Sequence, residues 1–263
     1  MTELLAPAKL NLALVVGPTR PDGRHEVATV LQRISLADRV RLDAADELTV
    51  TGFAADTLVG RALEVLAAEA EVEPRWHVEI DKHIPVAAGL GGGSSDAAAA
   101  LRLANWTLRR PLVDRALHEL AARLGADVPF FLTNGPQLGE GDGTALRPLD
   151  LPQDYWVLLV LPRGERKEST AAVYEAFRGD EGFTDRRAQL LQAVALGDLA
   201  LLPRNDLASS PLAEELRAHG AFRADVSGAG PAVYGLFAEQ GDAVMANAAL
   251  ADRGKAWIAA PGW

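Results

Sequence analysis

Gly89-Leu90-Gly91-Gly92-Gly93-Ser94-Ser95-Asp96 is the stretch that decides the fold of this chain. Before it, the segment 76–81 alternates apolar with polar residues, which is the period-two pattern of a strand. After it, the alanine-rich segment 96–108 favours a helix, with Ser94 or Ser95 as its N-cap. The glycines let backbone amides approach a ligand beside the partial positive charge of a helix N-terminus. Strand, glycine loop and helix together predict a cradle for a polyphosphate.

The spacing of the glycines separates this loop from two other phosphate-binding loops. No lysine follows the glycines as in a Walker loop, and the Gly-x-Gly-x-x-Gly spacing of dinucleotide-binding folds is missing. A flexible surface loop is the alternative interpretation. Its position between regular elements argues against that, because each glycine there costs about 0.5 to 1 kcal/mol relative to alanine. We therefore expect a functional loop of another nucleotide-binding class.

The composition limits the partners of the chain. A formal charge of −10 leaves no broad basic field for a nucleic acid or an anionic membrane surface, so an anionic ligand must be held locally. The absence of cysteine excludes disulfides, thiolate zinc sites and cysteine nucleophiles, and is compatible with a reducing cytoplasm. The N-terminus lacks a basic segment followed by an apolar one, and no run reaches about 18 apolar residues. We expect a soluble, unexported, cytoplasmic protein without nucleic-acid or membrane partners.

The length of 263 residues allows one large domain or two modest ones. The proline-punctuated segment Pro148 to Gln153 is typical of a domain boundary. We therefore predict a first domain over residues 1–150 and a second over residues 151–263. Both mix helical and strand patterns, which indicates an α+β or α/β chain with two lobes.

Two charged residues are candidates for chemistry. Asp127 stands in the apolar segment 124–131, where a carboxylate without a partner would lose hydration at a considerable cost. A helix cap or turn is the alternative role for an aspartate after a helix-ending glycine. Lys9 shares one face of a predicted strand with Asn11, but most lysines are solvated, so it is ambiguous alone.

The histidines do not predict a metal site. His77, His83, His118 and His219 have no zinc-like spacing, and no other pattern names a metal ligand. His25, in a predicted turn, would by itself be taken for a solvated loop residue.

Six motifs are distributed along the whole chain. They are Pro7-Ala8-Lys9-Leu10-Asn11, Pro21-Asp22-Gly23-Arg24-His25-Glu26, residues 85–96, residues 124–131, Asn205-Asp206-Leu207 and Val226-Ser227-Gly228-Ala229-Gly230. In these motifs and in their order the sequence resembles the 4-diphosphocytidyl-2-C-methyl-D-erythritol kinases, a family within the GHMP kinase superfamily.

The resemblance implies a fold and a reaction. The fold would be that of the GHMP kinases, with an N-terminal ATP lobe like domain 2 of ribosomal protein S5 and a ferredoxin-like C-terminal lobe. The reaction would transfer a phosphoryl group from ATP to a hydroxyl of 4-diphosphocytidyl-2-C-methyl-D-erythritol. It would give the 2-phosphate, in the non-mevalonate route to isoprenoid precursors. Magnesium is expected with ATP, and a monomer or weak dimer is expected in solution.

The resemblance also implies roles for residues. Asp127 would be the catalytic base that accepts the hydroxyl proton, with Lys9 as its cationic partner and Asn11 beside the acceptor. Separately from the resemblance, a hydroxyl of Ser94 or Ser95 is a candidate contact for magnesium, but the sequence shows no carboxylate cage and we name no metal ligand. The residues implied to bind the nucleotide are Pro85, Val86, Ala87, Ala88, Gly89, Leu90, Gly91, Gly92, Gly93, Ser94 and Ser95.

Recognition of the cytosine base is where the sequence departs from the family. An aromatic residue usually stacks on the ring where Arg24 stands, and a guanidinium can stack on a planar ring instead. The resemblance implies that Tyr174 forms the opposing face, although its apolar helical pattern equally fits the core. His25 would hydrogen-bond the cytosine edge. In the 227–230 loop, Ala229 replaces the usual hydroxyl residue, which leaves backbone amides to shape the phosphate pocket.

Other functions remain as alternatives. Homoserine, mevalonate and galactose kinases share the glycine loop, and the segment 22–26 is what favours a cytidine acceptor. A catalytically silent nucleotide sensor or scaffold would lose the base and its lysine, but Asp127 and Lys9 are both present. A hydrolase lacks support, since neither Gly-x-Ser-x-Gly nor His-Glu-x-x-His occurs.

Overall fold

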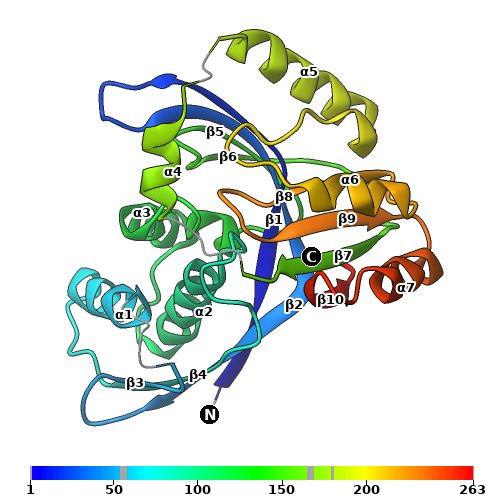
Figure 1. Cartoon of the computed structure of the whole chain (residues 1–263). Helices are drawn as coiled ribbons and strands as arrows, with labels where there is room; N and C mark the ends of the chain where they lie inside the picture. Colours follow the sequence, from blue (N-terminus) through cyan, green and yellow to red (C-terminus); the bar gives the residue numbers. More distant parts are fainter. Residues whose placement is uncertain (1, 54–57, 165–168, 179–180, 263) are drawn as a thin grey trace. The chain divides into compact units, whose positions relative to one another are not determined.

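The computed structural model describes residues 2–53, 58–164, 169–178 and 181–262 (Figure 1). Within it the chain forms two compact units that are interleaved in sequence. The first unit is built from residues 1–8, 36–86 and 91–134, and the second from residues 9–35, 87–90 and 135–263. The predicted boundary at residue 150 is not tested and stays a prediction.

The first unit has a sheet formed around the second half of β2 (His25–Ala44). That half pairs antiparallel with β4 (Trp76–Asp81), with Arg39 opposite Asp81, and β3 (Thr49–Thr51) pairs parallel with β4. The strand predicted from the alternating pattern of residues 76–81 is confirmed, and every second side chain of β4 is buried.

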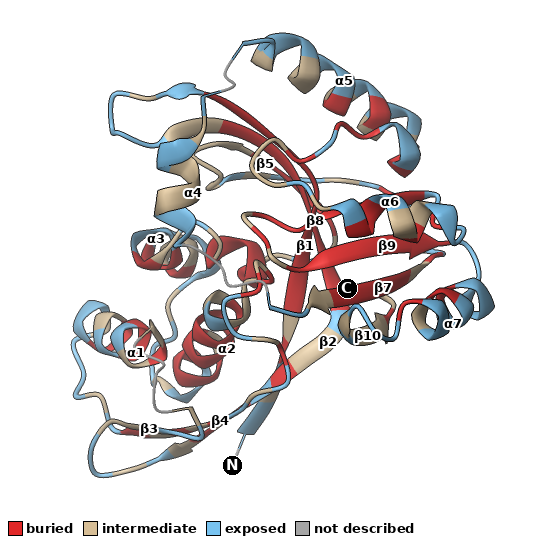
Figure 2. Cartoon of the chain, in the orientation of Figure 1, coloured by how far each residue is buried: buried red, intermediate tan, exposed pale blue. Residues whose placement is uncertain are grey.

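Helices complete the first unit. The alanine-rich α2 contacts α1 and η1, and α1 also contacts α3. Small alanine side chains on α2 allow this close approach, and most of the helix is buried (Figure 2). The elements are α1 (Leu58–Glu69), α2 (Gly92–Thr107), α3 (Asp114–Leu124) and the 3₁₀ helix η1 (Pro129–Leu132).

The predicted N-cap of α2 is wrong. The helix begins at Gly92, with Gly91 as the N-cap in a left-handed conformation (φ 70°, ψ 17°), and neither serine caps it. Glycine adopts this conformation without the penalty that a Cβ brings. The prediction started the helix too late because glycine has a low helix propensity. Here the left-handed conformation of Gly91, and not propensity, decides where the helix begins.

The second unit contains a hairpin and a separate antiparallel sheet. The first half of β2 pairs with β5 (Gln137–Gly141), which turns into β6 (Ala145–Pro148), and β11 (Pro261–Gly262) pairs with β2 at Ile34. The long strand β1 (Thr2–Thr19) also pairs with β2.

The separate sheet has the order β10-β7-β9-β8, and all of its neighbours are antiparallel. In sequence these strands follow the pattern β-α-β-β-α-β, which with this order is ferredoxin-like, as predicted. Its elements are β7 (Trp156–Pro162), α6 (Pro211–Ala218), β8 (Arg223–Val226), β9 (Val233–Phe237), α7 (Gln240–Ala249) and β10 (Gly254–Ala259). Between β7 and α6, the described residues also form α4 (Thr170–Ala176), α5 (Phe183–Leu196) and η2 (Leu199–Leu201).

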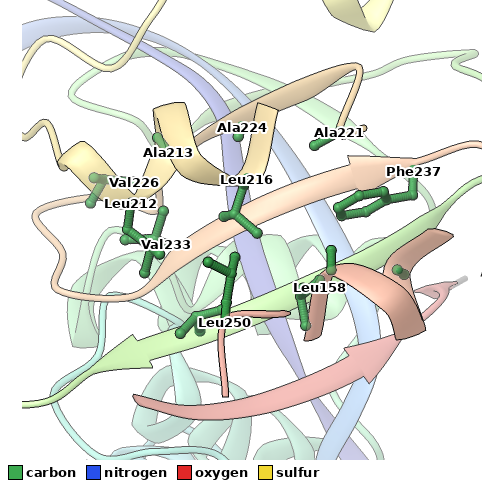
Figure 3. Close-up of a cluster of buried hydrophobic side chains, with 13 residues drawn as sticks. Leu158, Leu212, Ala213, Leu216, Ala221, Ala224, Val226, Val233, Phe237 and Leu250 are labelled. Carbon is green, nitrogen blue, oxygen red and sulfur yellow. The ribbon is translucent and has the colours of Figure 1, made fainter. Parts of the chain in front are cut away.

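A hydrophobic core joins this sheet to α6 and α7 (Figure 3). Val233 and Phe237 of β9 contribute to it, as does Leu216 of α6. Burying one such side chain stabilises the fold by about 1.5 to 3 kcal/mol. Tyr234 points to the opposite face of β9, where its hydroxyl donates a hydrogen bond to the Leu12 carbonyl at 3.0 Å. Side chains on one face of β9 therefore pack in the core, and Tyr234 on the other face bonds to β1.

No helix in the described part of the chain has the length and apolar character that a membrane span needs.

Candidate functional site

The part of the glycine run in the first unit forms the first turn of α2. The Ser95 N–H donates to the Gly91 carbonyl at 2.9 Å, whereas the N–H groups of a first helical turn have no intrahelical acceptor. Gly93 is exposed, and a Cβ placed there would meet no atom within 4 Å. The amides of Gly92 and Gly93 are thus suited to bind an anion.

Residues 87–90, which belong to the second unit and include the start of the run, are held in an unusual conformation. Ala87 has φ 56°, a left-handed value that costs a residue with a Cβ roughly 1 to 2 kcal/mol. A Cβ on Gly89 would lie 2.3 Å from the Ser227 carbonyl oxygen, so only glycine fits there. The Ala88 carbonyl accepts the Ala232 N–H at 3.2 Å, which fixes this segment. Strain of this kind concentrates at functional loops.

Lys9 and Asn11 lie together on β1, as their spacing predicts. The buried Lys9 ammonium donates a hydrogen bond to Asn11 Oδ1. Asn11 Nδ2 donates to Thr29 Oγ1 at 2.8 Å, and Thr29 Oγ1 donates to the Ala13 carbonyl at 2.7 Å. This chain of hydrogen bonds orients the Asn11 amide, so that its oxygen faces the Lys9 ammonium.

The loop Ser227 to Gly230 lies against this pair. Ser227 Oγ accepts the Asn11 N–H at 3.3 Å and donates to the Gly89 carbonyl at 3.1 Å. A Cβ on Gly228 (φ 58°) would lie 3.1 Å from Asn11 Oδ1 and 3.5 Å from Lys9 Nζ. In the described part of the chain, the N–H groups of Gly228 and Ala229 make no hydrogen bond, so both remain available to a ligand.

Asn205 holds that loop in place, a role that the motif Asn205-Asp206-Leu207 did not reveal. Its Nδ2 donates to the carbonyls of Val226 at 2.9 Å and Gly228 at 2.6 Å. Its Oδ1 accepts the Leu207 N–H at 2.9 Å. The available signal in the sequence was the asparagine of this motif, because an amide side chain can both donate and accept hydrogen bonds.

The rings of His25 and Tyr174 lie beside each other, and their role at a base site stays a prediction. Their ring centroids are 5.9 Å apart with an interplanar angle of 35°. Phe177, one turn further along the chain, meets His25 edge to face at 5.7 Å and was missed in the sequence. His25 Nδ1 lies 2.8 Å from the Gly17 carbonyl, which can only accept a hydrogen bond. Nδ1 therefore carries a proton, and in the neutral ring Nε2 is an acceptor.

The Arg24 side chain forms an ion pair with Asp142. Its guanidinium Nη1 pairs with Asp142 Oδ2 at 2.5 Å in the turn between β5 and β6, and 60% of its side chain is exposed. Burial alone would raise the pKa of Asp142, but hydrogen bonds from Thr144 and the charge of Arg24 hold this pKa below its ordinary value. The structure thus places Arg24 on Asp142, and its stacking on a base stays a prediction.

The remaining candidates lie in the first unit. Asp127 is half-buried in the turn between α3 and η1, where the Val128 N–H donates to the Gly125 carbonyl at 3.2 Å. Ser95 Oγ is buried and makes no hydrogen bond within the described residues, so this hydroxyl fits a role toward a bound phosphate or cation. No group of three His, Asp or Glu side chains in the described ranges is placed to hold a metal ion.

Known proteins resemble this chain over its whole length. The family model described as GHMP kinases N terminal domain matches residues 57–135, and that described as GHMP kinases C terminal matches residues 192–256. A 4-diphosphocytidyl-2-C-methyl-D-erythritol kinase of Synechococcus sp. (strain JA-3-3Ab) is 39% identical, over 94% of this chain and 88% of its own length.

Solved structures agree with the sequence comparison. A crystal structure of 4-(cytidine 5'-diphospho)-2C-methyl-D-erythritol kinase is 32% identical, with a TM-score of 0.84 and coverage of 100% of both chains. A homoserine kinase from Cytophaga hutchinsonii ATCC 33406 has a TM-score of 0.77 at 16% identity, covering 99% of this chain and 94% of its own, and shows the fold alone. The predicted family is confirmed: the chain belongs to the 4-diphosphocytidyl-2-C-methyl-D-erythritol kinases of the GHMP superfamily, which are ATP-dependent small-molecule kinases.

Proposed function

We propose that this protein transfers the γ-phosphoryl group of ATP to a hydroxyl of 4-diphosphocytidyl-2-C-methyl-D-erythritol. The product would be the 2-phosphate, an intermediate of the methylerythritol phosphate route to isoprenoid precursors. The observation that carries this proposal is the 39% identity, over 94% of the chain, to a relative named for this activity. The pairing of His25 with Tyr174 supports it, because a planar base needs an aromatic surface with a hydrogen-bonding group beside it.

The nucleotide would bind along residues 85–95. The amides of Gly92 and Gly93 and the left-handed segment at Ala87 support this assignment, since both present backbone to a ligand. Magnesium, when bound with ATP, offsets phosphate charge. The Ser95 hydroxyl is the group that we propose to face it.

Proton transfer and charge stabilisation would come from two side chains. Asp127 would accept the proton of the acceptor hydroxyl as its oxygen forms a bond to the γ-phosphorus and the bond to the β-phosphate oxygen breaks, releasing ADP. Lys9 would be the cationic partner that orients the hydroxyl or stabilises the transferring group. Its oriented hydrogen bond to Asn11 supports this role, because a fixed charge needs no rearrangement during the reaction.

Acceptor specificity is the direct test of this function. The native chain should release ADP from ATP with magnesium and the cytidine diphosphate acceptor, and not with homoserine, mevalonate or galactose. Steady-state ADP release measures this for all four alcohols. Turnover of another alcohol, with none of the cytidine compound, would contradict the proposed substrate.

His25→Ala is expected to raise KM for the cytidine acceptor about tenfold while KM for ATP changes less than about twofold. The lost hydrogen bond and ring contact are together of order 1 to 3 kcal/mol. Steady-state kinetics with each substrate varied in turn measures the two constants. His219→Ala, on an exposed histidine at the end of α6, is the matched control. Equal increases in both KM values would argue against a base-specific role.

Gly228→Ala is expected to lower kcat about ten- to hundredfold, because the new Cβ would push against Asn11 and Lys9 and misplace the lysine. It should also lower the free energy of unfolding by roughly 1 to 2 kcal/mol through its left-handed φ. Gly220→Ala is the matched control, since Gly220 also has positive φ (97°) but meets no atom within 4 Å. Chemical denaturation and ADP release separate the two effects. If both variants keep native kcat, the loop does not position Lys9.

We propose a cytoplasmic monomer or weak dimer whose only ligands are small molecules. The absence of cysteine is compatible with a reducing compartment, and the charge of −10 disfavours polyanionic partners.

A further inference from the structure

A buried ion triad connects the two sides of the glycine run within the first unit. Lys82 Nζ lies 2.5 Å from Asp38 Oδ2 and 2.6 Å from Asp96 Oδ2. Both carboxylates are completely buried, and 14% of the lysine side chain is exposed. Lys82 precedes the run, whereas Asp96 is the fifth residue of α2, whose first turn is formed by the last part of the run. One ammonium group therefore holds both ends.

Further contacts tighten this arrangement. Asp38 Oδ1 accepts the backbone N–H of His83 at 2.5 Å and that of Ile84 at 2.8 Å. A Cβ on Gly92 would lie 3.3 Å from Lys82 Nζ and 3.2 Å from Ile84 Cγ2. The chain entering the run is thus fixed directly against the first residue of α2.

The Lys82 ammonium is occupied by the protein itself. Besides the two carboxylates, the Phe53 ring lies 5.6 Å from Nζ, within the range of a cation–π contact. Burial by itself lowers the pKa of Lys82, but the hydrogen bonds and charges of Asp38 and Asp96 outweigh it and raise this pKa. The side chain stays charged and committed to its carboxylates, which distinguishes it from a lysine that binds phosphate.

We propose that Lys82 is a positioning residue for nucleotide binding, which acts through Asp96 and Asp38 to hold the first turn of α2 in its binding conformation. This inference rests on the proposed ATP site at residues 85–95. A loop that is already ordered loses less conformational freedom when a ligand binds, so the ordered loop binds the ligand more tightly. Loss of the triad should therefore weaken ATP binding and leave binding of the acceptor unchanged.

The experiment measures binding of ATP with magnesium by calorimetry in the absence of acceptor, at temperatures well below each variant's Tm. Lys82→Met should weaken ATP binding about tenfold. An effect of this size is typical of interactions between residues in contact. Asp96→Asn should weaken it to a similar extent. The double variant should bind ATP no more weakly than Lys82→Met alone, because both substitutions disrupt the same ion triad. The KM for the cytidine acceptor should stay within about twofold in all of them.

Controls keep the alternatives apart. His83→Ala, which removes an exposed neighbouring side chain but keeps the backbone N–H, should bind ATP normally. If Lys82→Met does not fold because two buried carboxylates lose their cation, Asp96→Asn and the double variant carry the test. Multiplying losses in the double variant would mean that Lys82 and Asp96 act independently, and unchanged ATP affinity in the folded variants would mean that the triad does not position the loop; either result would overturn the proposal. Normal ATP binding without turnover of the cytidine compound would instead refute the proposed substrate.

Discussion

Replacing Asp127 by asparagine is expected to lower kcat about 10²- to 10⁴-fold, the usual contribution of a positioned general base. The amide has nearly the same shape as the carboxylate but cannot accept the hydroxyl proton. Binding of both substrates needs no proton transfer, so their KM values should change little. Single-turnover and steady-state ADP release with the cytidine acceptor measure the two effects.

The matched control for this change is Asp114→Asn. Asp114 lies in the first turn of α3, is exposed, and belongs to the same helix-and-turn segment as Asp127. Its substitution removes the same charge and should leave kcat within about twofold, since a favourable helix-end charge affects stability by only about 0.3 to 1 kcal/mol. A native kcat in Asp127→Asn would show that another group, or solvent, accepts the proton.

Lys9→Met should lower kcat about 10²- to 10³-fold, a loss comparable to that of one preorganised electrostatic donor. Methionine keeps most of the apolar stem in its buried position on β1 but removes the charge beside Asn11. The free energy of unfolding should change much less than the activation free energy. Kinetics and chemical denaturation on the same preparation distinguish the two.

The control for Lys9 is Lys255→Met on β10, an exposed lysine that lies over the Trp257 ring. Losing that exposed contact should cost no more than about 1 kcal/mol of stability, with native kcat. If Asp127 and Lys9 act as one unit, the double variant should be scarcely slower than Asp127→Asn alone. Fully multiplicative losses would mean that the two residues act in separate steps.

Local patterns were reliable where one element decides the outcome. The alternation along β4 predicted its buried face, and the spacing of Lys9 and Asn11 placed both on one side of β1. The ferredoxin-like sheet also followed from the family resemblance, because the order of strands and helices is inherited with the motifs. These features depend on near neighbours in sequence or on the whole motif order.

Features that depend on distant contacts were missed or misplaced. The start of α2 lies in glycines that propensity assigns to a loop. Arg24 pairs with Asp142, which is 118 residues away in sequence, so no local pattern pointed to that pair. The triad at Lys82 likewise joins residues that lie 44 and 14 positions apart.

By itself, the sequence determined the family and the fold class, because both reside in residue types and their spacing, and it gave the groups that we propose to do chemistry. Only the tertiary structure decided what surrounds each group. It set Gly228 against Asn11 and Lys9, made Asn205 the support of that loop, and sealed Lys82 between two carboxylates. Hydrogen bonds need donor and acceptor atoms within about 3 Å, and ion pairs need charged atoms within about 4 Å. That proximity is created by packing and cannot be read from positions along a chain.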